Sequence, residues 1–241
     1  MKKFSIVTVC RNEEAAIRDT CESIVSQHCQ NFEWIVIDGA SSDGTLEILS
    51  EYRNEIQHLV SEPDTGIYNA MNKGAERATG EYLIFMNGGD RFADSDSLLF
   101  AAQSPRAQML YGDVYLGSQT RNIETYPDVV ESGYMLRNMI PHQATFYERA
   151  TFEAVGGYDE SFKIAADYDL YVRLFEDARV SHYHIPYPIA VFDLEGISNN
   201  RKFRQLRKRE NHRIRKQYFK TYRYSLKCLR QEIRNFCANR R

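Results

Sequence analysis

Residues 32–45 read FEWIVIDGASSDGT, and this stretch decides the fold class. Its first part, Phe32–Ile37, is rich in β-branched and aromatic residues, which is typical of a strand buried on both faces. The strand is expected to end at Asp38-Gly39, where polar residues begin. Apolar residues then recur at helical spacing from Leu46 to Tyr52, so a helix is predicted to follow the strand.

The same alternation of strand and helix runs through the first ninety residues. Further strands are predicted at 4–9, 56–60 and 82–86, and further helices at 13–27 and 67–78. Alternation of this kind indicates an α/β fold with a mainly parallel central sheet and helices on both faces. After residue 98 the pattern weakens, and we expect strands at 109–116, 122–126, 143–147 and 189–193 and a helix at 167–177.

The charge is distributed unevenly along the 241 residues. The net charge is only -2, but residues 201–241 hold 16 Lys and Arg against two acidic residues, so residues 1–200 carry a net charge of about -16. We therefore divide the chain into one domain, 1–200, and a basic tail, 201–241. The oligomeric state is left open.

The tail has the pattern of a basic amphipathic helix. Its apolar residues recur every three or four positions, at Ile214, Tyr218, Tyr222, Leu226, Leu229, Ile233 and Phe236. Such a helix favours contact with an anionic membrane surface. Docking of the helix on the acidic domain and self-association are the alternatives.

Several classes of protein are excluded by simple counts. No run of eighteen apolar residues exists, so no membrane-spanning helix is predicted. The apolar stretch near the start is too short for a typical signal peptide, and charged residues follow it directly. The five cysteines are scattered and include no CxxC pair. They fit a reducing cytoplasm and predict neither a disulfide framework nor a zinc site.

Polar clusters follow four predicted strands in succession. They are Arg11–Glu13, Asp38–Asp43, Glu62–Asp64 and Asn87–Asp90. Ligands of parallel sheets bind beyond the carboxyl ends of the strands, so these clusters predict a binding site. Asp38 could accept an N–H from a nucleobase, or it could be structural.

The cluster Asn87-Gly88-Gly89-Asp90 has the features of a diphosphate or metal site. The two glycines let a ligand approach the backbone, and Asp90 offers the hard oxygen that Mg²⁺ and Mn²⁺ prefer. A simple glycine turn with a solvated Asp90 is the alternative.

In order, these motifs resemble those of the inverting family 2 glycosyltransferases, which have the GT-A nucleotide-diphospho-sugar transferase fold. The matching stretches are Ser5–Val9, Arg11–Glu13, Trp34–Thr45, Ser61–Gly74, Phe85–Asp90, Pro141–Phe146 and Ala166–Leu170. The resemblance is greatest to the bacterial enzymes that build exopolysaccharide, capsule and lipopolysaccharide, including the colanic-acid type.

The resemblance implies a nucleotide-sugar site, with uracil as the usual base. The residues that it places there are Thr8, Arg11, Glu13, Asp38, Asp64, Lys73, Asn87, Gly88, Gly89 and Asp90. Asp90 would hold a divalent cofactor, Mn²⁺ or Mg²⁺. The family's DXD motif begins with Asp, whereas this chain has Asn87, so the strength of metal binding is in question.

The resemblance also implies the catalytic base. Asp167 occupies its position, although Ala166 replaces the acid or serine that usually precedes it. An inverting transfer needs one carboxylate to take the proton of the attacking hydroxyl. His142, Gln143 and Asp169 are expected to contact the acceptor or the diphosphate, with structural roles as alternatives, and Gly196–Ser198 resembles a loop that closes over the donor.

These features predict a metal-dependent, inverting hexosyltransferase. It would move sugar from a nucleoside-diphosphate sugar, of the UDP type, to a glycan or lipid-linked acceptor in surface polysaccharide synthesis, at the inner face of the cell membrane. A dehydrogenase or nucleotidyltransferase is the first alternative, but the chain lacks G-x-G-x-x-G after its first strand and has no P-loop. A nucleic-acid-binding module is the second, and the acidic domain argues against it. We expect no nucleic-acid partner.

Overall fold

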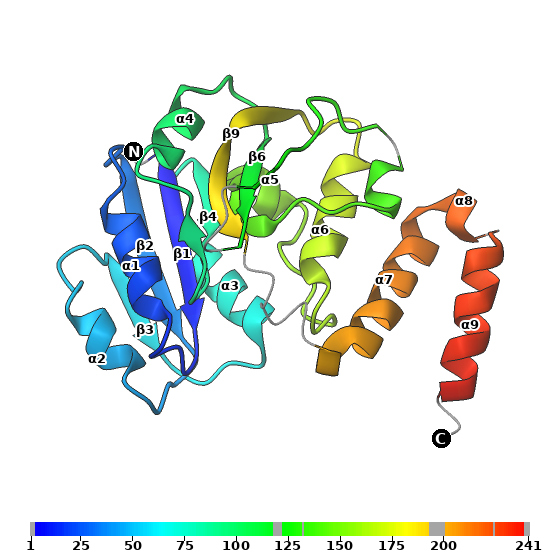
Figure 1. Cartoon of the computed structure of the whole chain (residues 1–241), viewed down its shortest axis with the longest axis horizontal. Coiled ribbons are helices and arrows are strands. Elements are labelled where there is room, and N and C mark those ends of the chain that lie inside the picture. Colours follow the sequence, from blue (N-terminus) through cyan, green and yellow to red (C-terminus); the bar gives the residue numbers. More distant parts are fainter. Residues whose placement is uncertain (1–2, 118–121, 132, 193–200, 224, 239–241) are drawn as a thin grey trace.

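The computed structural model describes residues 3–117, 122–131, 133–192, 201–223 and 225–238, and shows one central sheet with helices packed around it (Figure 1). The strand order is β3-β2-β1-β4-β8-β6-β9-β5, and β7 pairs with β6. The strands are β1 Phe4–Cys10, β2 Phe32–Asp38, β3 His58–Ser61, β4 Tyr82–Phe85, β5 Arg91–Phe92, β6 Met109–Leu116, β7 Ile123–Glu124, β8 Thr145–Glu148 and β9 His182–Phe192. Strands β3, β2, β1, β4, β6 and β9 run in the same direction, which confirms the predicted α/β class with a mainly parallel sheet.

The helices lie on both sides of this sheet and extend beyond it at the C-terminal end (Figure 1). The α-helices are α1 Ile17–Val25, α2 Thr45–Ser50, α3 Ile67–Ala75, α4 Ser97–Gln103, α5 Arg149–Ala154, α6 Ala166–Phe175, α7 Arg204–Tyr218, α8 Lys220–Arg223 and α9 Leu226–Ala238. Short 3₁₀ turns are η1 Tyr134–Leu136, η2 His142–Ala144 and η4 Arg201–Phe203.

The four strands β3, β2, β1 and β4 form the parallel half of the sheet. Every residue of β1, β2 and β4 is buried, as expected for apolar strands covered on both faces. The register pairs Cys10 with Asp38 and Asp38 with Ser61, so the carboxyl ends of β1, β2 and β3 lie side by side. The polar clusters that follow these strands therefore gather at one edge.

Strand β8 brings a distant part of the chain to the same edge. It is antiparallel to β4, with Leu83 opposite Tyr147, so the start of β8 lies near the end of β4. The turn η2 leads directly into β8. This topology places His142 and Gln143 beside the residues that follow β4, although more than fifty residues separate them in the sequence.

Strand β9 is longer than predicted. It begins at His182 and not at Ile189, because the two prolines at positions 186 and 188 weaken the strand pattern in the sequence. The register with β6 shifts between Gly112 and Val114, so a bulge leaves residues of β9 out of regular pairing. The bulge accommodates prolines, which lack an N–H group for the ladder.

The remaining differences are at element boundaries. Helix α1 begins four residues later than predicted, β3 begins two residues later, and β7 spans two residues of the five predicted. The short helices α4 and α5 were not predicted, because each is six or seven residues long and carries no extended apolar period.

The described residues of the basic tail form three α-helices, whereas the sequence predicted one helix. Phe219 has an extended backbone, is buried and ends α7. Helix α7 packs against α6, and α9 packs against α7 (Figure 1). Ile214, from the predicted apolar face, is fully buried. The predicted boundary after residue 200 adjoins residues 193–200, which lie outside the described part of the chain, as does the predicted loop Gly196–Ser198.

Candidate active site

The carboxylate of Asp38 closes the loop that follows β2. It is fully buried, and it accepts hydrogen bonds from the Ser41 amide at 3.0 Å, from the Ser61 hydroxyl at 2.6 Å and from the Ser41 hydroxyl. Ala40, between them, has a left-handed backbone with φ of 57°, which is uncommon for a residue with a Cβ atom. Asp38 thus stabilises a constrained loop at the sheet edge.

Gly39 lies in a narrow space between the loops after β1 and β3. A Cβ atom at this position would be 2.4 Å from Asp64 Oδ2 and 3.3 Å from Arg11 Cβ. Only glycine fits there without displacing these side chains. The structure therefore places both Arg11 and Asp64 close to Gly39. Lys73, nearby on α3, contacts Glu62 at 2.6 Å.

Thr8 lies apart from this edge. It is fully buried inside the sheet, and its hydroxyl accepts a hydrogen bond from the Trp34 indole at 2.9 Å. The structure therefore places Thr8 in the core and not with the other residues predicted to line the nucleotide site.

The turn after β4 is built as a compact loop around Asp90. The backbone N–H of Asn87 donates to Asp90 Oδ2 at 3.0 Å, and the backbone N–H of Asp90 donates to the backbone carbonyl of Asn87 at 2.8 Å. Gly89 has φ of 91° in this turn. A Cβ atom on Gly88 would be 2.8 Å from Glu13 Cγ, so Glu13 packs directly against the turn.

Negative charge accumulates where Glu13 meets this turn. Burial raises the pKa of Glu13, and the charges of Asp43 and Asp90 raise it further. A carboxyl whose pKa is raised by like-charged neighbours is stabilised by a cation. The region beside Asp90 thus has the electrostatic character of a cation site.

His142 lies between the carboxylates of Asp90 and Asp167. Its Nε2 atom is 3.6 Å from Asp90 Oδ2, and its Nδ1 atom is 3.9 Å from Asp167 Oδ2. Burial acts to lower the pKa of His142, but the two carboxylates outweigh it and the pKa is raised. One imidazole ring therefore links the turn after β4 to the first turn of α6.

Asp167 is the second residue of α6 and is 8% exposed. Its Oδ1 atom accepts hydrogen bonds from the Tyr168 amide at 2.7 Å and from the Tyr68 hydroxyl at 3.2 Å. Burial raises the pKa of Asp167, although His142 and these two hydrogen bonds act in the opposite direction. The carboxyl is thus oriented by fixed donors and is more basic than an ordinary aspartate.

Two buried oxygen atoms of this site lack a hydrogen-bond partner. They are Asn87 Oδ1 and Gln143 Oε1. Gln143 Nε2 donates to Asp90 Oδ1 at 2.8 Å, and Asn87 Nδ2 lies 3.1 Å from His142 Nε2, which accepts its N–H when the imidazole is neutral. Buried polar atoms are almost always paired, so two unpaired acceptors beside Asp90 indicate a place for a ligand or ion.

Asp169 does not belong to this group. It is 2% exposed and forms an ion pair with Arg173 at 2.8 Å, and the Arg173 guanidinium also donates to the carbonyls of Val155 and Gly157. The contacts of Asp169 match the structural alternative, because its carboxylate holds Arg173, which fastens α6 to the turn after α5.

Two residues beside Asp167 were not predicted from the sequence. Tyr68 lies 99 positions away in the chain, and its hydrogen bond to Asp167 follows only from the fold. Glu210 of α7 accepts the backbone N–H groups of Lys163, Ile164 and Ala165 at 2.9, 3.0 and 3.0 Å. One signal was present: Glu210 is one of two acidic residues in a strongly basic segment.

The fold and the site together define a class of protein. A mainly parallel sheet of this order, with acidic turns at the carboxyl ends of β2 and β4, is the GT-A fold of nucleotide-diphospho-sugar transferases. The chain belongs to glycosyl transferase family 2, whose model matches residues 5–155. It is therefore a glycosyltransferase, which decides against the alternative enzyme classes.

Relatives in two bacteria agree with this assignment. The chain is 31% identical over 204 residues to a "PGL/p-HBAD biosynthesis glycosyltransferase" of Mycobacterium tuberculosis, a match that covers 81% of this chain and 79% of the relative. It is 36% identical over 91 residues to TuaG of Bacillus subtilis, whose name links it to teichuronic acid biosynthesis, and this match covers 36% of each chain.

Solved structures share the fold. S. aureus TarS 1–349 in complex with UDP-GlcNAc matches with a TM-score of 0.72 at 20% identity, covering 90% of this chain and 67% of that one. The mannosyltransferase PcManGT from Pyrobaculum calidifontis, in complex with GDP-Man and Mn²⁺, matches with a TM-score of 0.67 at 16% identity, covering 88% and 62%. No helix in the described part of the chain is long and apolar enough to cross a membrane.

Proposed function

We propose that this enzyme transfers a sugar, with inversion, from a UDP-sugar to a hydroxyl group of a glycan or lipid-linked acceptor of surface polysaccharide synthesis. In this proposal Asp167 is the general base and Asp90 holds a divalent metal. The family assignment, the UDP-GlcNAc bound to TarS and the name of TuaG support it.

The observation that carries the proposal is the position of His142 between Asp90 and Asp167. The ring approaches Asp90 at 3.6 Å on one side and Asp167 at 3.9 Å on the other. A leaving diphosphate near Asp90 and an acceptor hydroxyl near Asp167 would then lie within a few ångströms of each other. An in-line displacement at the sugar carbon needs this arrangement.

The residues around Asp90 fit a hard divalent cation. The donors are a carboxylate, the unpaired amide oxygen of Asn87 and the unpaired amide oxygen of Gln143, and oxygen ligands of this kind suit Mg²⁺ and Mn²⁺. Asn87 can thus serve where the family has aspartate, with one negative charge fewer. Such a metal would neutralise the charge that grows on the departing diphosphate.

Asp167 has the properties that a base for this reaction needs. As the acceptor oxygen bonds to the anomeric carbon, its proton passes to the Asp167 carboxylate, and the bond between that carbon and the diphosphate oxygen breaks. The raised pKa makes the carboxylate a better proton acceptor. The hydrogen bonds from Tyr68 and the Tyr168 amide hold it in position.

The remaining contacts of the donor would form at the ends of β1, β2 and β3. Arg11 and Asp64 meet across Gly39, where a nucleoside can approach the backbone closely. Asp38 would have to exchange a serine partner to bind a base directly, so we assign the base contact to the loop that Asp38 stabilises.

A donor panel and one substitution test the proposal. The thermal shift of the protein is measured with UDP- and GDP-sugars, with and without Mn²⁺, and turnover is then measured for Asp167→Asn. We expect a Mn²⁺-dependent shift with a UDP-sugar, and loss of transfer in Asp167→Asn with unchanged donor binding. Asp177→Asn, which changes a carboxylate of the α6–β9 loop that pairs with Arg179, is the control. Full turnover in Asp167→Asn would remove Asp167 as the base.

We also propose that the tail contacts an anionic membrane surface, where a lipid-linked acceptor would reside. Leu229 and Ile233 are 54% and 56% exposed on successive turns of α9. Lys227, Arg230 and Arg234 are exposed on the same helix. Apolar side chains flanked by cations are the pattern of an interfacial helix.

Vesicle binding tests this surface. Removal of the whole tail is a poor test, because it also removes Glu210 and Ile214 of α7, which pack on the catalytic domain. The double variant Leu229→Ser/Ile233→Ser leaves α7 intact. We expect wild-type protein, but not this variant, to sediment with anionic vesicles, and equal sedimentation of both would refute the membrane contact.

A further inference from the structure

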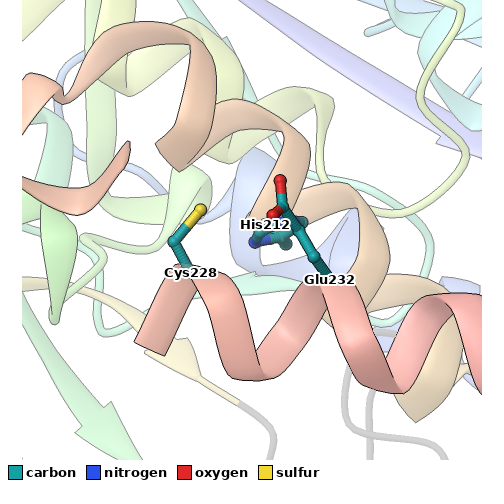
Figure 2. Close-up of side chains that lie close together, drawn as sticks. All are labelled: His212, Cys228 and Glu232. Atoms are coloured by element: carbon teal, nitrogen blue, oxygen red, sulfur yellow. The ribbon is translucent and has the colours of Figure 1, made fainter. Parts of the chain in front are cut away.

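The tail contains a second cluster of metal-ligating side chains, far from Asp90 in the sequence. Cys228 and Glu232 are four residues apart on α9, and His212 is on α7. One nitrogen of His212, the Cys228 sulfur and one oxygen of Glu232 all lie within 4.8 Å of one another. Figure 2 shows Cys228 and Glu232 on successive turns of α9, on the side of that helix next to His212.

We propose that His212, Cys228 and Glu232 bind one Zn²⁺ ion, and that this ion fastens α9 to α7. The inference is independent of the proposed sugar transfer, because it concerns the tail alone. Residues four apart on a helix share one face, so α9 offers two ligands to one point and α7 supplies the third.

The geometry needs only small adjustments. Zinc binds nitrogen and oxygen at about 2.1 Å and sulfur at about 2.3 Å, so its tetrahedral ligands lie roughly 3.5 Å apart. The three ligand atoms now lie within 4.8 Å of one another. Side-chain rotations that move each atom by about 1 Å would bring them to the separation of tetrahedral zinc ligands. Cys228 and His212 are 2% and 7% exposed, so two ligands are shielded from bulk water.

One nitrogen of His212 and one carboxylate oxygen of Glu232 already have a hydrogen-bond partner. Tyr222 lies 3.0 Å from His212 Nδ1, and Lys216 contacts Glu232 Oε1. These contacts leave His212 Nε2 and Glu232 Oε2 for the ion. Metal-binding imidazoles and carboxylates commonly have such supporting partners, which orient the ligand.

The donor set selects the kind of metal. A thiolate with an imidazole and a carboxylate favours Zn²⁺ or Co²⁺, whereas Mg²⁺ and Mn²⁺ prefer oxygen ligands alone. An open groove of about 470 Å³ between α7 and α9, lined in part by His212, Lys216 and Glu232, gives an ion access from solvent. It also leaves room for a water molecule as the fourth ligand.

Spacing explains why the sequence predicted no zinc site. The three ligands come from two helices, with fifteen residues between His212 and Cys228, and no CxxC pair marks them. Binding releases the Cys228 proton to solvent, since the thiolate is the ligand. The affinity is therefore expected to increase with pH.

Cobalt titration of the full-length, metal-free protein tests the site. Cobalt bound to a thiolate absorbs in the near ultraviolet, and Asp90, His142 and Asp167 supply no sulfur, so the band reports Cys228. We expect one equivalent of Co²⁺ to give the band and one equivalent of Zn²⁺ to remove it. Cys228→Ser should lose the band, and Cys237→Ser, which changes an exposed cysteine of the same helix, should keep it.

Zinc affinity and helix protection give a second measurement. His212→Gln should bind zinc at least tenfold more weakly than wild type. Hydrogen exchange of residues 226–238 should slow on addition of zinc in wild type and not in Cys228→Ser. The proposal is overturned if wild type gives no band, if Cys228→Ser retains it, or if zinc leaves the exchange of α9 unchanged.

Discussion

Glu210 joins the tail to the segment that precedes the proposed catalytic base. Its carboxylate is 8% exposed and accepts three backbone N–H groups, from residues 163–165, at 2.9–3.0 Å. These residues directly precede α6, which carries Asp167. Glu210→Ala would leave the backbone N–H groups of residues 163–165 without their acceptor, where α7 packs next to the start of α6.

The three hydrogen bonds of Glu210 set the expected decrease in the free energy of unfolding. A hydrogen bond to a charged acceptor contributes about 1.5–3 kcal/mol, and neighbouring bonds are not additive. We expect Glu210→Ala to lower the free energy of unfolding by about 3 kcal/mol. For a chain of 241 residues this corresponds to a decrease in Tm of about 6–12 °C.

Calorimetry and steady-state kinetics measure the two consequences. We expect kcat to fall more than the affinity for donor, because the proposed donor contacts lie at the ends of β1, β2 and β3 and not on α6. Glu210→Asp should recover part of the loss, and Glu55→Gln, which changes an exposed carboxylate, is the control. A Glu210→Ala variant that melts within 2 °C of wild type would refute the proposed role of these bonds.

Three further predictions concern the site. His142→Gln removes a charge that lowers the pKa of Asp167, so the acidic limb of the pH–rate profile should move to higher pH, and a limb that stays in place would contradict the coupling. Asn87→Asp adds a second carboxylate to the turn, so the Tm without metal should fall while Mn²⁺ binds on the order of tenfold more tightly, about 1.4 kcal/mol, as isothermal titration would measure. Gly39→Ala places a Cβ atom 2.4 Å from Asp64 Oδ2, so UDP binding should weaken with little change in Tm. An unaltered affinity for UDP would contradict the proposal that this loop contacts the nucleotide.

Much of the fold could be predicted because its central strands are apolar throughout. Strands such as Phe4–Cys10 and Phe32–Asp38 are buried on both faces and contain the β-branched runs that identify them. The start of β9 could not be predicted, since Pro186 and Pro188 contradict a strand unless a bulge is known. The start of β9 is set by its pairing with β6, which the local sequence does not reveal.

The sequence could name candidate residues for the site but not their geometry. Motif resemblance identified Asp90, His142 and Asp167, and the fold brings them together. Burial could not be predicted: Thr8 was expected at the nucleotide and lies in the core under Trp34. Partners such as Tyr68 could not be predicted either, because no local pattern relates residues 99 positions apart.

Helix α7 shows docking of the tail on the rest of the chain, one of the alternatives that the sequence left open. Helix α7 docks through specific contacts, with Arg213 over Phe162 at 4.5 Å and Arg215 over Tyr168 at 5.4 Å. These guanidinium groups stack on aromatic rings, so docking uses packing as well as charge. Other cations stay exposed on α7 and α9, among them Arg204, Lys208, Arg209, Lys227, Arg230 and Arg234. Docking of α7 and membrane contact of α9 are therefore compatible, and substitutions confined to one helix can separate them.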